Sequence, residues 1–117
     1  MNKSFDDALL SEEVIRALEF ETKLEFAQNF FELYLAPLND VISKPLTDKG
    51  LETIKHIGHK MGGHAEFPNL IPIGETLENL SLEMMKNGKK DITEFSKLFA
   101  EMQQIYESEI EPFVKQN

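Results

Sequence analysis

The fold of this chain is decided around "HIGHKMGGH", residues 56–64, near the middle of the sequence. The stretch holds all three histidines and three of the six glycines of a 117-residue chain. A glycine inside a helix costs about 1 kcal/mol relative to alanine, so helix interiors usually avoid it. Apolar residues nevertheless recur here at helical spacing, which predicts a helix over about 49–66. The glycines and histidines therefore need a reason other than helix propensity.

The inward face of this helix follows from residues spaced three or four positions apart: Leu51, Ile54, Gly58, Met61 and Ala65. Gly58 belongs to that face, where a missing side chain lets a neighbouring helix pack closely. Thr47 or Asp48 is expected as the N-cap, because either side chain can accept a hydrogen bond from a free backbone N–H group.

Upstream, a long helical pattern starts at Ser11, followed by two glutamates that suit the positive end of a helix dipole, and runs to about Ser43. Pro37 lies inside this pattern, so we expect a kink or a break near Ala36. The main apolar stripe consists of Phe20, Leu24, Ala27, Phe31, Leu35, Leu38 and Ile42.

A second apolar stripe, formed by Phe26, Phe30 and Leu33, lies on roughly the opposite side of the same helix. A helix with two apolar faces is sandwiched between neighbours or leaves one face for a partner. We expect a separate N-terminal helix to cover the second stripe with its own apolar residues: Val14, Ile15 and Leu18.

Downstream, "FPN" at 67–69 ends the central helix, and a further helix is predicted over about 70–86, with Gly88 as its C-terminal cap. Asp91 begins a sequence that resembles a capping box, and the last helix continues from there until Pro112. Amphipathic helices with short connections form antiparallel bundles.

We therefore predict an all-α fold: an antiparallel up-and-down four-helix bundle with an additional N-terminal helix. It forms a single domain over 1–117, with the bundle core at about 20–112. Hydrophobic residues make up 41% of the chain, enough for one core. The sequence shows no membrane-spanning run, no signal peptide and no cysteine, so we expect a cytoplasmic protein.

The formal net charge of −9 makes nucleic acid an improbable partner, because an acidic surface repels phosphates. The charge favours a partner with a basic face, or it serves solubility alone.

On a helical wheel His59 lies about 110° from the centre of the inward face, so it should be exposed on the flank. Gly63 lies one turn further on, on nearly the same face. Helical side chains lean toward the N-terminus, so a side chain at 63 would crowd the His59 ring. We expect glycine there to leave room for another protein's active site.

The residues from His59 to Ala65, followed by "FPNL" at 67–70 and Leu77-Glu78, resemble the histidine phosphotransfer (HPt) domain family. The helix, turn and helix that precede His59 fit the same family. The resemblance implies that His59 accepts a phosphoryl group from a receiver-domain aspartate and passes it to another receiver. Many family members carry a lysine where this chain has Gly62.

The resemblance also implies the partners: receiver domains of response regulators, or a hybrid sensor kinase, that dock on a monomer. The expected docking surface around His59 and Gly63 comprises Lys55, His56, Lys60, Gly62 and Glu66. No cofactor of its own is expected, since the receiver would supply Mg²⁺, and no nucleotide-binding loop for autonomous kinase activity is present.

Four alternatives remain open at this point. His59 could be an ordinary surface histidine, or the domain could bind receivers without accepting phosphate, a reading that Gly62 favours. Glu52, His56 and His59 could hold a metal ion from one helix face, although no second ligand cluster accompanies them and no metal is expected. His64 is a weaker phosphoacceptor candidate than His59, because Pro68 follows it at the i+4 position.

Overall fold

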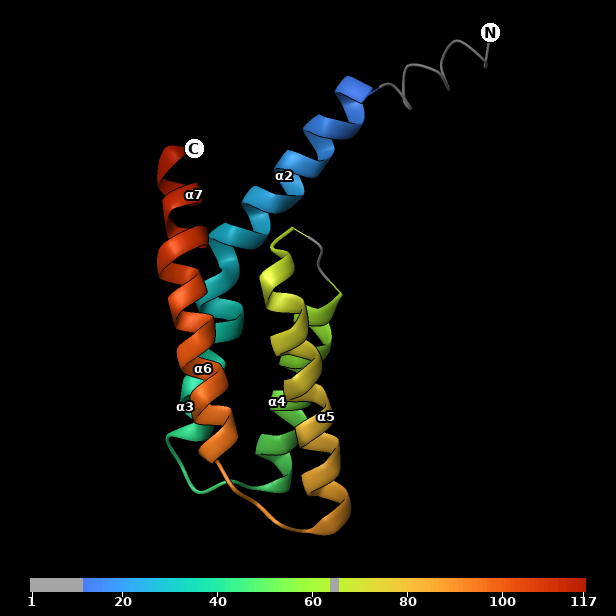
Figure 1. Ribbon diagram of the computed structural model, residues 1–117, viewed down its shortest axis with the longest axis vertical. Coiled ribbons are helices and arrows are strands. Elements are labelled where there is room, and N and C mark those ends of the chain that lie inside the picture. The colour runs from blue at the N-terminus through green and yellow to red at the C-terminus, as the bar shows by residue number, and fades with distance from the viewer. Residues whose placement is uncertain (1–11, 64–65) are drawn as a thin grey trace, which may run out of the picture.

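All the helices of the described residues, 12–63 and 66–117, belong to four rods in this computed structural model (Figure 1). The first rod consists of α2 (Glu12–Phe30), η1 (Phe31–Leu35) and α3 (Ala36–Ile42), and the second is α4 (Asp48–Gly62). The third consists of η2 (Pro68–Leu70) and α5 (Ile71–Asn87). The fourth consists of α6 (Thr93–Ile105), η3 (Tyr106–Ile110) and α7 (Glu111–Gln116). These residues contain no strand, and the predicted all-α class is confirmed.

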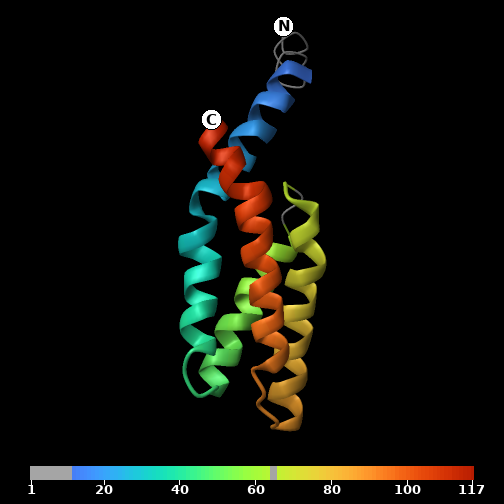
Figure 2. The ribbon, with the colours of Figure 1, turned by 60° about the vertical axis from the view of Figure 1, so that its left-hand side comes forward.

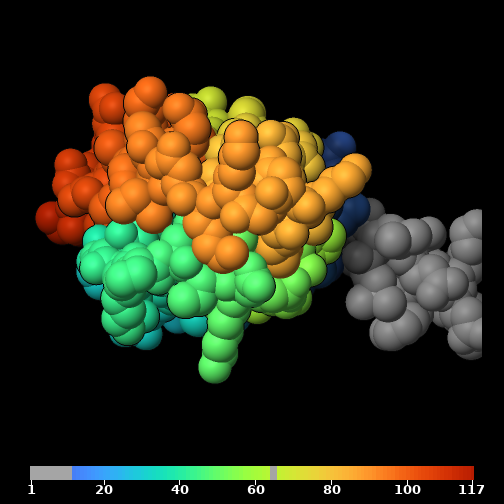
Figure 3. Space-filling view, turned by 90° about the horizontal axis from the view of Figure 1, so that it is seen from below, coloured from blue at the N-terminus to red at the C-terminus, as the bar shows by residue number. Residues whose placement is uncertain are grey.

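The four rods lie side by side around one core, as Figures 1 and 2 both show. The second and third rods form one closely packed pair, α4 with α5. The first and fourth rods form the other pair, in which α2 contacts α7 and α3 contacts α6. The α3–α4 and α5–α6 connections meet at one end, seen from below in Figure 3. Short connections therefore place consecutive rods in opposite directions.

Two prolines inside helices explain an irregularity in the first and fourth rods. Pro37 and Pro112 each stand two residues after a π-helical turn, in the related sequences "FELYLAP" (31–37) and "YESEIEP" (106–112). Proline lacks an N–H group and its ring clashes with the carbonyl four residues earlier, a strain that the wider π turn relieves. The irregularity predicted near Ala36 takes this form, and the helix continues without a break.

The separate N-terminal helix that we expected is not present among the described residues, because 12–42 form one continuous rod. Its upper end projects past the other rods (Figure 2). Ile15 and Leu18 are exposed there and cannot cover Phe26 and Phe30, which lie further along the same continuous helix. Ser11, the predicted first residue of the helix, lies outside the described residues.

Aromatic rings from other elements bury the second stripe instead. Phe26 contacts Phe67, and Phe30 stacks on Tyr106 with ring centroids 6.0 Å apart. Leu33, in the same predicted stripe, stays 57% exposed. The predicted burial of two residues of the main stripe is also wrong, because Phe20 and Phe31 are exposed.

Glycine sets the spacing of the other pair of rods. A Cβ atom added to Gly58 would lie 2.5 Å from the Gly74 carbonyl oxygen, and one added to Gly74 would lie 2.7 Å from the Gly58 oxygen. No real Cβ fits at such distances, so α4 and α5 touch through their backbones. The predicted close approach at Gly58 is confirmed, and it determines which residues of α5 stand beside α4.

Most predicted helix ends are confirmed by their caps. Thr47 accepts a hydrogen bond from the Gly50 N–H group at 3.0 Å, and Gly88 ends α5 in the left-handed conformation with φ 76°. Asp91 stands just before Ile92, the N-cap of α6, and accepts bonds from the Thr93 N–H and hydroxyl groups, so the start of the helix is held by a local turn and not by the predicted capping box. The predicted 49–66 helix ends earlier than expected, at Gly62.

Candidate functional site

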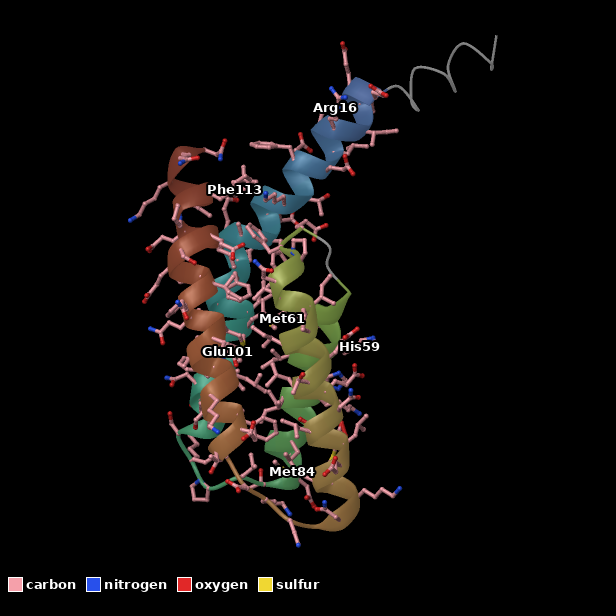
Figure 4. All side chains as sticks on the ribbon, viewed as in Figure 1. Arg16, His59, Met61, Met84, Glu101 and Phe113 are labelled. Atoms are coloured by element: carbon pink, nitrogen blue, oxygen red, sulfur yellow. The ribbon has the colours of Figure 1, made fainter. Side chains whose placement is uncertain are left out.

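His59 stands on the flank of α4 that faces α5, with 75% of its side chain exposed. Figure 4 shows it at the outer side of the α4–α5 pair, far from the α6 rod that carries Glu101. The exposure predicted from the helical wheel is confirmed. An exposed imidazole on a rigid helix is accessible to a partner protein.

The Nδ1 atom of His59 lies 3.2 Å from the Oε2 atom of Glu78 on α5. A carboxylate only accepts hydrogen bonds, so this contact requires a proton on Nδ1. The Nε2 atom of a neutral ring then carries the free lone pair, which is the nucleophilic form. The carboxylate also stabilises any positive charge that develops on the ring.

Sequence reasoning missed the role of Glu78, although the residue is part of the motif that carries the family resemblance. The two residues are 19 positions apart, and no local spacing relates them. Their contact depends on the Gly58–Gly74 packing, because Gly58 also lies against the backbone of Glu78. Only a prediction of the α4–α5 register could have found it.

The other predicted surface residues of α4 divide between its two flanks. Lys55 pairs with Glu52 at 3.2 Å, and His56 lies 3.9 Å from the second oxygen of the same carboxylate. Lys60 and His56 face the first rod, where they line a shallow groove of about 340 Å³ together with Leu33. The basic side chains of His56 and Lys60 thus lie on the side of α4 that faces the first rod, whereas His59 faces α5.

Glu66, another predicted surface residue, lies close to the first rod. Its negative charge, together with burial as the larger cause, raises the pKa of the Tyr34 hydroxyl. Tyr34 is a core residue of the first rod that packs on Phe26 and Phe30. Glu66 therefore lies within electrostatic range of a core residue of the first rod.

The two glycines after His59 have different surroundings. A Cβ atom at Gly62 would lie 3.6 Å from the Cγ atom of Glu75, so this position faces the first turn of α5. A Cβ atom at Gly63 would meet only the carbonyl oxygens of Lys60 and His59, at 3.6 and 3.7 Å, and no described side chain. Alanine at 63 would therefore leave the ring free, and the crowding we expected requires a longer side chain.

A metal site has little support. Within residues 12–63 and 66–117 no group of three histidine, aspartate or glutamate side chains is arranged to hold an ion. Glu52 and His56 lie near each other, but His59 is paired with Glu78 instead of joining them. His64, the weaker phosphoacceptor candidate, and Ala65 lie outside the described residues.

Comparisons with protein-family models, with curated proteins and with solved structures find no match to this chain. In the described part of the chain, no helix combines the length and apolar character needed to cross a membrane. The chemistry of the site is therefore inferred from its own residues.

Proposed function

We propose that the chain is a phosphorelay intermediate that accepts a phosphoryl group on His59 and passes it on. In this proposal the four rods are the antiparallel up-and-down bundle of a histidine phosphotransfer domain. The observation that carries the proposal is the exposed His59 ring with its Nδ1 atom held by Glu78, 3.2 Å away. In a neutral ring, that arrangement leaves the Nε2 lone pair free on an exposed side chain.

The transfer step needs no group beyond the two proteins and the ion of the receiver. The Nε2 lone pair of His59 attacks the phosphorus of a receiver's aspartyl phosphate. The N–P bond forms, the bond between phosphorus and the aspartate oxygen breaks, and that oxygen keeps the electron pair as a carboxylate. The phosphorylated ring retains its Nδ1 proton and becomes cationic, and Glu78 stabilises this charge. Transfer to a second receiver reverses the same steps.

The receiver contributes the remaining electrostatics in this proposal. Its site holds Mg²⁺, which neutralises the phosphoryl oxygens while the histidine attacks. Lys55 and Lys60, on the same helix as His59, offer positive charges in an otherwise acidic chain with a net charge of −9. They favour a partner with negative charge around its own active site.

Leu33 joins the proposed docking surface as its apolar contact. The residue was predicted to become a binding candidate if exposed, and it is 57% exposed beside His56 and Lys60. Phe26 and Phe30, which were grouped with it, are buried and drop out. A receiver placed over His59 would meet Leu33 across the groove between the first rod and α4.

A receiver-binding domain without phosphotransfer is the second candidate, and the surroundings of Gly62 favour it. A lysine at that position would lie beside Glu75, at the edge of the site, whereas Lys60 faces the opposite flank. The chain therefore lacks one positive charge that many family members place next to the phosphoryl group.

Incubation with phosphorylated receiver domains tests the proposal. We expect wild type to acquire an acid-labile, base-stable label that is absent in His59→Gln and retained in the control Glu101→Gln, an exposed acid of α6. Label that persists in His59→Gln would mean that another residue accepts the phosphoryl group. Stable receiver binding with no label on wild type would favour the second candidate.

A further inference from the structure

A groove of about 660 Å³ lies between the first and fourth rods, on the pair that does not carry His59. It extends along α3 and α6. Its volume lies within the range of sites that hold part of a ligand or a partner side-chain cluster. Nothing in the proposed phosphotransfer uses this face.

Three aromatic residues contribute to the apolar part of the groove: Phe31, Phe99 and Tyr106. Phe31 is 52% exposed, and its ring centroid lies 5.9 Å from that of Tyr106. These two residues begin the two π-helical turns, so the groove lies where the prolines have widened both helices. An exposed aromatic surface in a recess typically marks a binding site.

The charges that line the groove are all negative. Glu107 follows Tyr106 at one end, and Asp40 lies at the other end, nine residues beyond Phe31 on the first rod, or about 14 Å along the helix. No lysine or arginine is among the lining residues. Asp40 pairs with Lys44 at 3.1 Å, but both side chains are about two-thirds exposed, and such pairs exchange readily.

We propose that this groove binds a helical segment of a partner protein that carries two basic side chains flanking apolar ones. Apolar side chains of the segment would pack on Phe31 and Phe99. Its two basic groups, about eight residues apart, would reach Glu107 and Asp40, and a cation next to Tyr106 gains from the aromatic face. The segment would lie between two antiparallel helices as a further helix of the bundle. This binding does not depend on phosphotransfer at His59.

Tryptophan fluorescence gives a direct test, because the chain contains no tryptophan. The probe is a helical peptide of about 14 residues with two arginines about eight residues apart, leucines on the same face and one tryptophan. We expect saturable binding at low ionic strength that weakens with added salt. A peptide with glutamates in place of the arginines should not bind.

Variants locate the binding. We expect Phe31→Ala and the double variant Asp40→Asn, Glu107→Gln each to weaken peptide binding by about tenfold. Glu101→Gln, an exposed acid of α6 outside the groove (Figure 4), and His59→Gln should leave it unchanged. The proposal is overturned if the arginine peptide does not bind, if the glutamate peptide binds equally, or if Glu101→Gln weakens binding as much as the groove variants do.

Discussion

The two pairs of rods in this molecule pack through different kinds of residues: glycines in one pair, aromatic residues and prolines in the other. In the α4–α5 pair, Gly58 and Gly74 remove side chains so that the backbones touch. In the pair formed by the first and fourth rods, aromatic rings such as Phe30 and Tyr106 separate the helices, and prolines widen one turn of each. Backbone contact permits one register, whereas ring contacts leave recesses at the surface.

This difference teaches where each kind of site can form. A fixed register is needed to hold Glu78 at 3.2 Å from His59, because a small slip of α5 would break that contact. A recess such as the groove at Phe31 needs helices held apart by large side chains. The predictions that follow test this contrast, in order of decreasing effect.

The largest effect is expected from Gly58→Ala. The added Cβ would lie 2.5 Å from the Gly74 carbonyl oxygen, so the helices must separate, and the free energy of unfolding should fall by about 3 kcal/mol. Gly62→Ala is the matched control, since its Cβ meets Glu75 at 3.6 Å and should change stability by less than about 1 kcal/mol. Urea denaturation measures both. Equal losses in the two variants would refute the special role of Gly58.

Glu78→Gln tests whether the register serves His59. A glutamine amide can bond either tautomer and carries no charge, so the rate of phosphoryl transfer should fall about tenfold, or ~1.4 kcal/mol in the barrier. Nitrogen NMR of the His59 ring should show a mixture of the two neutral tautomers, one protonated on Nδ1 and one on Nε2. In wild type the Nδ1-protonated tautomer should predominate. Glu75→Gln is the control on the same helix. An unchanged tautomer in Glu78→Gln would remove the positioning role.

Pro37→Ala tests the cause of the π turns in the other pair. Restoring an N–H group lets the turn return to ordinary α-helical hydrogen bonding, and we expect a gain of about 1 kcal/mol in the free energy of unfolding. Pro72→Ala, in the first turn of α5 where proline is tolerated, should change it by less than about 0.5 kcal/mol. Thermal and urea unfolding compare the two. A loss of stability in Pro37→Ala would mean that aromatic packing, not proline, imposes the wide turn.

The smallest effect concerns the start of α6, in the same pair. The hydroxyl of Thr93, and then its backbone N–H group, hold the pKa of Asp91 below its usual value. Because the folded pKa is the lower one, this stabilisation is present above the unfolded pKa of about 3.9 and is lost as the pH falls through the folded value. Wild type should therefore lose stability relative to Asp91→Asn between about pH 5 and pH 3. Parallel curves for the two proteins would contradict this prediction.

Several features could be predicted from the sequence because their causes are local. Thr47 and Gly88 cap helices through atoms a few residues away. The exposure of His59 follows from its angle on α4 relative to Leu51 and Ile54, which are fully buried. Local spacing determines all of these, whatever the rest of the chain does.

Other predictions failed where the answer depends on distant residues. Phe31 belongs to an apolar stripe by spacing, but the π turn that it begins shifts the helix phase, and its ring is half exposed. Val14, Ile15 and Leu18 were expected to form a separate helix, yet nothing in the chain interrupts the rod between them and Phe26. Within the first rod, Pro37 was the residue that predicted a break, and the π turn before it allows the helix to continue.

The sequence by itself determined the helices, most of their caps, the inward position of Gly58 and the outward position of His59. Each of these depends on hydrogen bonds and side-chain directions within a few turns of one helix. Only the tertiary structure decided that Glu78 holds the Nδ1 atom of His59, that Leu33 is exposed beside His56 and Lys60, and that a groove lies at Phe31. These features depend on how helices far apart in the chain are set against one another, which glycine contacts and aromatic packing control.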